Sequence, residues 1–102
     1  MAKGYWVAQV DVTDMDTYKK YVAAIQEPLA KYCARYVTRG GETTFAEGAS
    51  RERVVIIEFA SYEQALACYN SPEYKQAATF RKDASAADIT IVEGYDGPQP
   101  GD

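Results

Sequence analysis

Hydrophobic and polar residues alternate near the start of the chain. Within residues 5–12, one set of alternate positions is apolar: Trp6, Ala8, Val10 and Val12. The other set is more polar: Tyr5, Val7, Gln9 and Asp11. This period of two predicts a strand. The stretch RVVIIEF has four consecutive apolar β-branched residues and predicts a strand at 52–60 that is covered on both faces. Further strands are expected at 35–46, bent at Gly40-Gly41, and at 87–94, with a hairpin turn at 47–50.

Apolar residues at three- and four-residue steps predict a helix from Thr13 or Asp14 to about residue 33. Its expected core-facing residues are Met15, Tyr18, Val22, Ile25, Leu29 and Cys33. Pro28 should kink or split this helix, because it lacks a backbone donor. A second helix is expected from the capping box at 61–64 through residue 69, and Ser71-Pro72 restarts it to about residue 84.

The order of these elements is β-α-β-β-α-β, which is a split βαβ pattern. Right-handed connections lead us to expect the first and third strands as parallel neighbours at the centre of the sheet. Asp11 and Glu58 occupy matching positions before the two helix caps. We therefore expect these carboxylates to lie near each other at one end of the sheet.

Two helices cover only one face of a four-stranded sheet. The residues expected on this helix-facing side are Val55, Ile57 and Phe59, with Trp6, Ala8, Val10 and Val12. The other face would expose Val7, Val54 and Ile56, and exposed apolar patches mark interfaces. We expect a second copy to pack on this face as an isologous homodimer. The alternative, a cover made by the C-terminal tail, is less favourable because that tail is rich in Gly, Pro and Asp.

Composition narrows the classes of function. The 102 residues carry a net charge of −4 and contain no histidine. We therefore expect no nucleic-acid or membrane partner, and no catalytic triad, haem or zinc site. No metal or nucleotide motif occurs, so no cofactor is expected. We expect one domain at 1–95, an extended or mobile tail at 96–102, and a cytoplasmic location, with Cys33 and Cys68 as buried, reduced thiols.

The predicted neighbours Asp11 and Glu58 are the first candidate for chemistry. Two adjacent carboxylates repel, so one would keep its proton to a higher pH and the pair would suit acid–base catalysis. The alternative is that both are solvated or ion-paired. Arg39 is expected opposite Glu58, either as a structural ion pair or as an anion clamp.

Other polar residues are assigned lesser roles. Gln9, Tyr5 and Tyr74 are candidate ligand contacts, while the remaining tyrosines are expected in the core or at its rim. Residues 51–53 are expected to form a solvated flank of the turn. Arg81 has three alternative placements: an ion pair with Glu73, an ion pair with Asp88, or a position in a pocket.

Several stretches resemble one bacterial family: GYWVAQVDVTDMDTYKKYV, RGG, VIIEF, ALACYNSPEYKQA and IVEGYDG. The chain is similar to domain of unknown function 1330, in the dimeric α+β barrel superfamily of ferredoxin-like folds. This resemblance implies an α+β, βαββαβ fold with an antiparallel four-stranded sheet, helices on one face, and a barrel of two packed sheets. The family often has glycine near position 33, so we expect this helix end, with Cys33, to close differently.

The same resemblance implies a range of activities. Related families include cofactor-independent monooxygenases, small isomerases and decarboxylases, haem peroxidases and ligand-sensing modules. We expect a cofactor-independent enzyme that uses Glu58, Asp11 and Arg39 on a small anionic or carbonyl substrate. The alternative is a non-catalytic module for ligand binding or dimerisation.

Overall fold

A computed structural model of the protein describes residues 2–102. Its elements are β1 (Gly4–Val12), α1 (Met15–Lys31), β2 (Arg35–Arg39), β3 (Arg53–Phe59), α2 (Tyr62–Tyr69), α3 (Pro72–Lys82) and β4 (Ser85–Glu93). The predicted order is confirmed, with the second helical segment divided into α2 and α3. No helix within the described range has both the length and the apolar character needed to span a bilayer.

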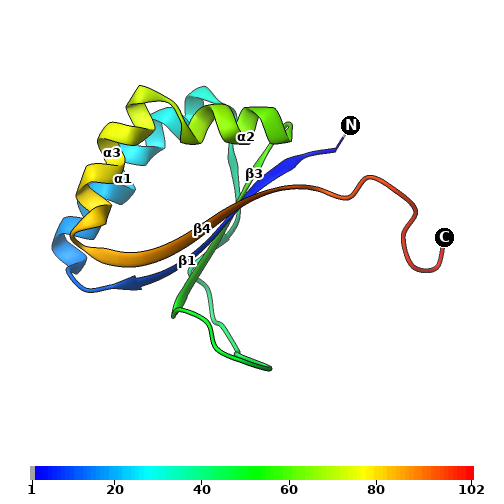
Figure 1. Cartoon of the computed structure of the whole chain (residues 1–102), viewed down its shortest axis with the longest axis horizontal. Coiled ribbons are helices and arrows are strands. Elements are labelled where there is room, and N and C mark those ends of the chain that lie inside the picture. Colours follow the sequence, from blue (N-terminus) through cyan, green and yellow to red (C-terminus); the bar gives the residue numbers. More distant parts are fainter. Residues whose placement is uncertain (1) are drawn as a thin grey trace.

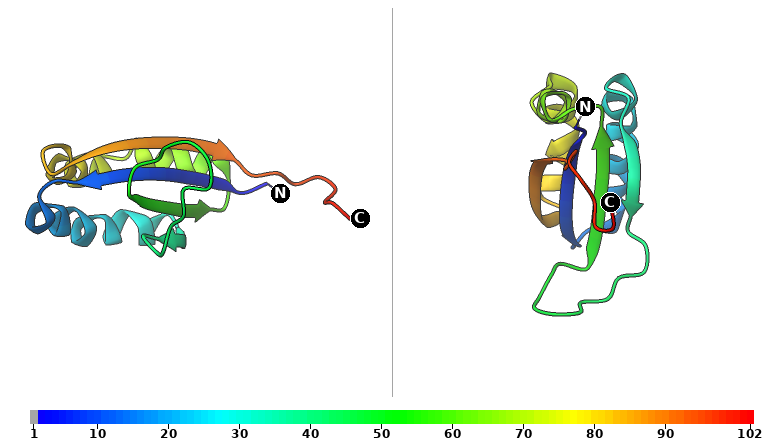
Figure 2. Two further views of the ribbon diagram at one scale, coloured as in Figure 1. Left: turned by 90° about the horizontal axis from the view of Figure 1, so that it is seen from below. Right: turned by 90° about the vertical axis from the view of Figure 1, so that its right-hand side faces the viewer.

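The four strands form one sheet in the order β2-β3-β1-β4, and the helices lie on one face of it (Figures 1 and 2). All three strand pairings are antiparallel. This confirms the ferredoxin-like fold, but the expected parallel pairing of β1 and β3 is wrong. The α1 crossover makes β1 parallel to β2; the β2–β3 hairpin then reverses the chain, so β3 runs antiparallel to β1.

The hydrophobic core fills the space between the sheet and the helices. The predicted helix-facing sets are confirmed, since Trp6 pairs with Ile57 and both are buried. Trp6 packs against Phe59 and Tyr74, with ring centroids 5.0 Å apart in each pair, and its Nε1 donates to the Ala65 carbonyl at 2.9 Å. Aromatic side chains thus supply much of the core in this small protein.

Strand β2 is shorter than predicted. It ends at Arg39, and residues 40–52 form a loop that projects from the body (Figure 2). These residues, GGETTFAEGASRE, have no sustained alternation of apolar side chains with which to cover the sheet. The register shifts between Tyr36 and Thr38, so the irregularity lies at Val37 and not at the predicted Gly40-Gly41.

Three side-chain caps begin the helices where the sequence predicts them. Asp14, Ser61 and Ser71 accept hydrogen bonds from backbone N–H groups three residues further on. The α1 helix is not split at Pro28, which lies in its last turn. Its predicted stripe is correct in the middle, but Met15 and Cys33 are exposed at its ends, and Cys33 is therefore not the buried thiol that was expected.

The C-terminus of α1 closes in a left-handed residue. Cys33 has φ 57°, and it is the only residue other than glycine with positive φ in the described range. The Ala34 N–H donates to Leu29 O and the Cys33 N–H to Ala30 O, which is a Schellman motif. The expectation of a different closure is wrong, because these two hydrogen bonds hold cysteine in the conformation that glycine favours.

We therefore expect Cys33→Gly to stabilise the protein by about 1 kcal/mol, since a side chain strains the left-handed conformation. Urea denaturation under reducing conditions measures this change. The matched control is Cys33→Ala, which keeps the Cβ and should gain nothing. Equal stability of the glycine and alanine variants would contradict the prediction.

Candidate functional site

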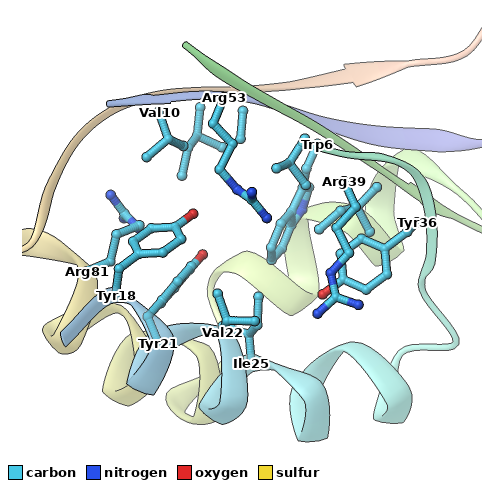
Figure 3. A pocket seen from close by; sticks show the side chains of 14 residues that line it. Trp6, Val10, Tyr18, Tyr21, Val22, Ile25, Tyr36, Arg39, Arg53 and Arg81 are labelled. Carbon is cyan, nitrogen blue, oxygen red and sulfur yellow. The ribbon is translucent and has the colours of Figure 1, made fainter. Parts of the chain in front are cut away.

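A cavity lies between the sheet and helix α1, inside the single chain. Its volume is about 30 Å³, enough for about two water molecules. Its walls are mostly apolar or aromatic and include Trp6, Ile25, Val55 and Ile57. We call it the inner cavity (Figure 3).

Three arginines, Arg39, Arg53 and Arg81, also line the inner cavity, and no carboxylate does. None of them forms an ion pair with another residue in the range 2–102. The Nε atoms of Arg53 and Arg81 are buried and have no hydrogen-bond partner among these residues. Buried donors are nearly always satisfied in proteins, so this cluster is short of acceptors.

Each arginine lies near a tyrosine ring. The Cζ atom of Arg39 is 4.3 Å from the ring centroid of Tyr36, and that of Arg53 is 6.0 Å from Tyr18. Arg81 Cζ is 5.6 Å from the Tyr21 ring. These contacts hold Arg39 and Arg53 by ring electrostatics and leave N–H groups available for another partner. The Arg81 guanidinium also interacts with the hydroxyls of Tyr74 and Tyr21, and only its Nε has no partner in the described range.

A wider hollow, the outer groove, shares part of this lining. It has a volume of about 410 Å³ and lies along α1, with Met15, Lys19 and Gln26 among its walls. Tyr18, Val22, Arg39 and Arg53 line both hollows. The two arginines therefore stand between the inner cavity and the outer groove.

Gly40 makes room for Arg53. It has φ 71°, and a Cβ at this position would lie 2.7 Å from the Cζ atom of Arg53. Its N–H donates to Val54 O at 3.1 Å, which fixes the backbone beside the arginine. Glycine suits the left-handed backbone here, and a larger residue would require the Arg53 guanidinium to shift.

Arg39 is the one predicted catalytic residue that lines the inner cavity. It pairs with Val55 and not with Glu58, so the expected Arg39–Glu58 pairing is wrong. The bulge at Val37 adds one residue to β2 and turns Arg39 toward the helices. Arg35 is the residue opposite Glu58.

Asp11 and Glu58 do not meet. Glu58 pairs with Tyr5, whereas Asp11 pairs with Ala86 six residues further along β1, roughly 20 Å away. The expected carboxylate pair is therefore wrong, because antiparallel strands place equivalent positions of β1 and β3 at opposite ends.

Asp11 belongs to an ion-paired cluster with the start of β3. Its carboxylate accepts from Glu52 N–H at 2.9 Å and from Arg51 Nη1 at 3.0 Å, and Arg51 Nε reaches Asp88 at 3.0 Å. The Glu52 N–H, and then Arg51, hold the pKa of Asp11 below its usual value. The direction of this pKa shift favours the charged form of Asp11. It is opposite to the shift expected if Asp11 were the protonated member of a carboxylate pair.

The other predicted residues lie on the open sheet face or in the core. Tyr5 and Gln9 are on the open face, where the Tyr5 hydroxyl donates to Glu58 at 3.2 Å. Tyr74 is fully buried, and its hydroxyl lies 2.9 Å from that of Tyr21. A ligand role for these residues stays a prediction, as does catalysis by Glu58 or Asp11.

The match to known proteins accords with this fold. A family model described as "Domain of unknown function (DUF1330)" matches residues 3–95. The chain belongs to this family. No curated protein matches it. No group of three potential metal ligands occurs in the described residues of this DUF1330 protein.

Solved structures share the fold at low identity. A Rhodopseudomonas palustris protein of unknown function, RPA0582, has a TM-score of 0.73 at 14% identity, over 94% of this chain and 85% of that one. SnoaB of Streptomyces nogalater, a cofactor-independent oxygenase, has a TM-score of 0.62 at 10% identity over 100% of both chains. A dimeric ferredoxin-like protein of unknown function from Thermobifida fusca has a TM-score of 0.57 at 14% identity, over 90% and 89%.

Sequence reasoning missed Arg53 as a cavity residue of this DUF1330 protein. The prediction that 51–53 form a solvated flank is wrong for Arg53, which lines the inner cavity. The signal was present, because Arg53 precedes Val55 by two residues and so belongs to the helix-facing set. Arg81 reaches the cavity from the last turn of α3, the third of the outcomes left open for it.

Proposed function

We propose that this protein binds a small organic anion with an apolar body in the inner cavity and the outer groove. The observation that supports this most directly is the set of three arginines without a carboxylate partner, Arg39, Arg53 and Arg81. The chain has more acidic than basic residues, with a net charge of −4, yet no acidic residue lines this cavity. An anionic ligand would supply acceptors for Arg39 and would offset the cost of partly burying Arg53 and Arg81.

The walls favour a planar apolar body attached to the anion. Trp6, Tyr18 and Tyr36 offer ring faces and edges, and Ile25 and Val55 complete an apolar surface. The outer groove has the volume of an ordinary small-molecule site. The anionic group then lies between Arg39 and Arg53, where the two hollows meet.

Titration with benzoate and with its neutral analogue benzamide tests this proposal. Trp6, the only tryptophan, lines the cavity and reports binding by its fluorescence. We expect saturable binding of benzoate and at least tenfold weaker binding of benzamide, since a charge-assisted hydrogen bond is worth roughly 1.5–3 kcal/mol. Arg39→Met should remove this preference, whereas Arg35→Met, on the open face of the same strand, should keep it. Equal affinity for both molecules would overturn the proposal.

Cofactor-independent oxygenation is a second candidate, favoured by the structural likeness to SnoaB over the full length of both chains. Within the inner cavity the acid–base groups are tyrosines and arginines, with no carboxylate. Oxygen uptake in the presence of an electron-rich phenolic acid, compared with Tyr21→Phe, tests it. Acid–base catalysis by Glu58 or Asp11 would instead use the open sheet face, where the two carboxylates lie far apart on β1 and β3.

We also propose a homodimer through the open sheet face. Val7, Val54 and Ile56 lie side by side there and are only half-buried in the single chain. The C-terminal residues lead away from the end of β4 and do not cover them (Figure 1). The T. fusca structure, which is described as dimeric, supports a second copy as the cover.

For this dimer we expect Ile56→Glu to yield a monomer at micromolar concentration, because it places a charge at the centre of an apolar interface. Sedimentation velocity distinguishes the two states. The control is Ala67→Glu, at an exposed position on α2, which should leave the dimer intact. A native protein that sediments as a monomer would contradict the proposal.

The contact between Gly40 and Arg53 gives a separate prediction. We expect Gly40→Ala to weaken benzoate binding about tenfold, because the added methyl group displaces the guanidinium. The matched control is Gly48→Ala, which has φ 73° and nothing within 4 Å of the added Cβ. Both variants should lose about 1 kcal/mol of stability. If both also bind benzoate normally, Gly40 does not position Arg53.

A further inference from the structure

The loop between β2 and β3 projects past the open sheet face. Figure 2 (left) views the molecule from that face, and the loop at residues 40–52 passes in front of the strands. In Figure 1 the same loop lies on the side of the sheet opposite the helices. A second copy packed on the open sheet face would therefore lie beside this loop. The inference below rests on the proposed homodimer through that face.

The loop carries an exposed aromatic ring between two acidic residues. Phe45 is 47% exposed, and Glu42 and Glu47 lie on either side of it in the sequence. Residues 40–50 contain no basic residue, and neither glutamate forms an ion pair within residues 2–102. The loop thus combines an apolar side chain with two unmatched negative charges.

The end of the open sheet face where β1 begins has an unmatched cation. Opposed positions across the strands form one row there, with Lys3 beside it: Arg35, Glu58, Tyr5 and Val92. Lys3 Nζ is 3.9 Å from Glu58 Oε2, whereas Arg35 forms no ion pair in the described range. Val92 is 45% exposed. We call these five residues the basic row, which offers an apolar surface next to an unpaired arginine.

The opposite end of the open sheet face is acidic. There the carboxylates of Asp11 and Asp88 share one cation, Arg51, at 3.0 Å each. The loop leaves the sheet at this end, because β3 begins at Arg53. Five residues of β3, roughly 17 Å, separate Arg53 from the basic-row residue Glu58. The loop and the basic row of one chain therefore lie at opposite ends of the sheet.

Charge decides how a second copy fits against the loop. When two sheets pack with aligned strands, the second copy presents either its acidic end or its basic row to the loop. The acidic end would bring Asp11 and Asp88 toward the two loop glutamates, and like charges repel. The basic row would bring an unpaired arginine instead. The favoured dimer therefore has the strands of its two copies running in opposite directions.

We propose that Phe45 of each copy packs on Tyr5 and Val92 of the other, with Glu42 and Glu47 facing Arg35 of that copy. The contact forms twice, because the dimer is isologous. It covers Phe45 and Val92, two apolar side chains that the single chain leaves exposed. The packed ring contributes mainly to affinity, and the charges at the rim contribute mainly to the choice of orientation.

Phe45→Ser tests the apolar part of this contact. We expect it to raise the dissociation constant of the dimer about tenfold, because a ring packed in an interface is lost twice. Sedimentation velocity over a dilution series measures this constant. The matched control is Phe80→Ser, at a position 39% exposed on α3 in the helix layer, which should leave the constant unchanged.

Charge exchange between copies tests the orientation. Arg35→Glu puts like charges at both contacts of its own dimer, and so does the double variant Glu42→Arg/Glu47→Arg. We expect each dimer to dissociate about threefold to tenfold more readily at 150 mM salt, and an equal mixture to recover the native affinity in mixed dimers. The control for net charge is Glu27→Arg/Glu63→Arg, at exposed positions on α1 and α2, which should not rescue Arg35→Glu.

The outcomes separate the loop contact from the dimer itself. A native protein that sediments as a monomer overturns both. A native dimer with the same dissociation constant after Phe45→Ser overturns the loop contact and leaves the sheet interface intact. A mixture of the charge variants that binds no more tightly than the control mixture overturns the opposed orientation. Circular dichroism of each variant verifies that it is folded.

Discussion

Arg53→Met is expected to make the protein more stable and at the same time to weaken benzoate binding by roughly tenfold to a hundredfold. The buried Nε of Arg53 has no partner within residues 2–102, and an unsatisfied buried donor costs about 1–3 kcal/mol. Methionine fills a similar volume without a charge, so we expect a gain of about 1 kcal/mol in the free energy of unfolding. Urea denaturation and benzoate titration measure the two effects.

Arg51→Met is the matched control for Arg53→Met. Arg51 lies two residues earlier and forms ion pairs with Asp11 and Asp88, both at 3.0 Å. We expect this variant to lose up to about 1 kcal/mol and to bind benzoate normally, since exposed ion pairs contribute little. A destabilised Arg53→Met that still binds benzoate would show that Arg53 is structural.

Trp6→Ala is expected to remove about 3–5 kcal/mol of stability, a large part of what a domain of this size has. Trp6 is 2% exposed, and it contacts Phe59, Tyr69 and Tyr74 across the sheet–helix layer. The substitution leaves a cavity and an Ala65 carbonyl without its indole donor. Urea denaturation followed by far-UV circular dichroism measures the loss, because the fluorescent probe is gone.

Trp6→Phe is a milder change, since it keeps one aromatic ring in the core and loses the indole N–H together with the second ring. We expect it to cost about 1–2 kcal/mol. Tyr95→Ala, at a position 71% exposed, should change stability by less than about 0.5 kcal/mol. A loss below 1 kcal/mol for Trp6→Ala would contradict the placement of this side chain in the core.

Most of the fold could be predicted because its signals are local. Ser61 and Ser71 cap helices through bonds to residues three positions away, and the alternation of Trp6 and Val10 fixes which face of β1 meets the helices. Strand β2 was predicted too long because the loop after Arg39 offers no periodic signal for where pairing stops. Its end depends on β3, which begins only at Arg53.

The candidate site was harder to predict because it depends on strand direction and register. Asp11 and Glu58 occupy equivalent positions in the sequence, but antiparallel pairing of β1 with β3 sends them to opposite ends of the sheet. Arg53 was assigned to a turn from its charged neighbours, although its spacing from Val55 already placed it on the helix-facing side.

By itself, the sequence determined the order of the elements, the helix caps and the two faces of the central strands, because these depend on contacts between residues close together in the chain. Only the tertiary structure decided where Arg39 points. One extra residue at Val37 shifts the register, so that Arg39 meets Val55 and faces the helices beside Arg53. Side chains alternate with a period of two, and a shift of one residue therefore moves Arg39 from the open face of the sheet to the helix-facing side, where it lines the cavity.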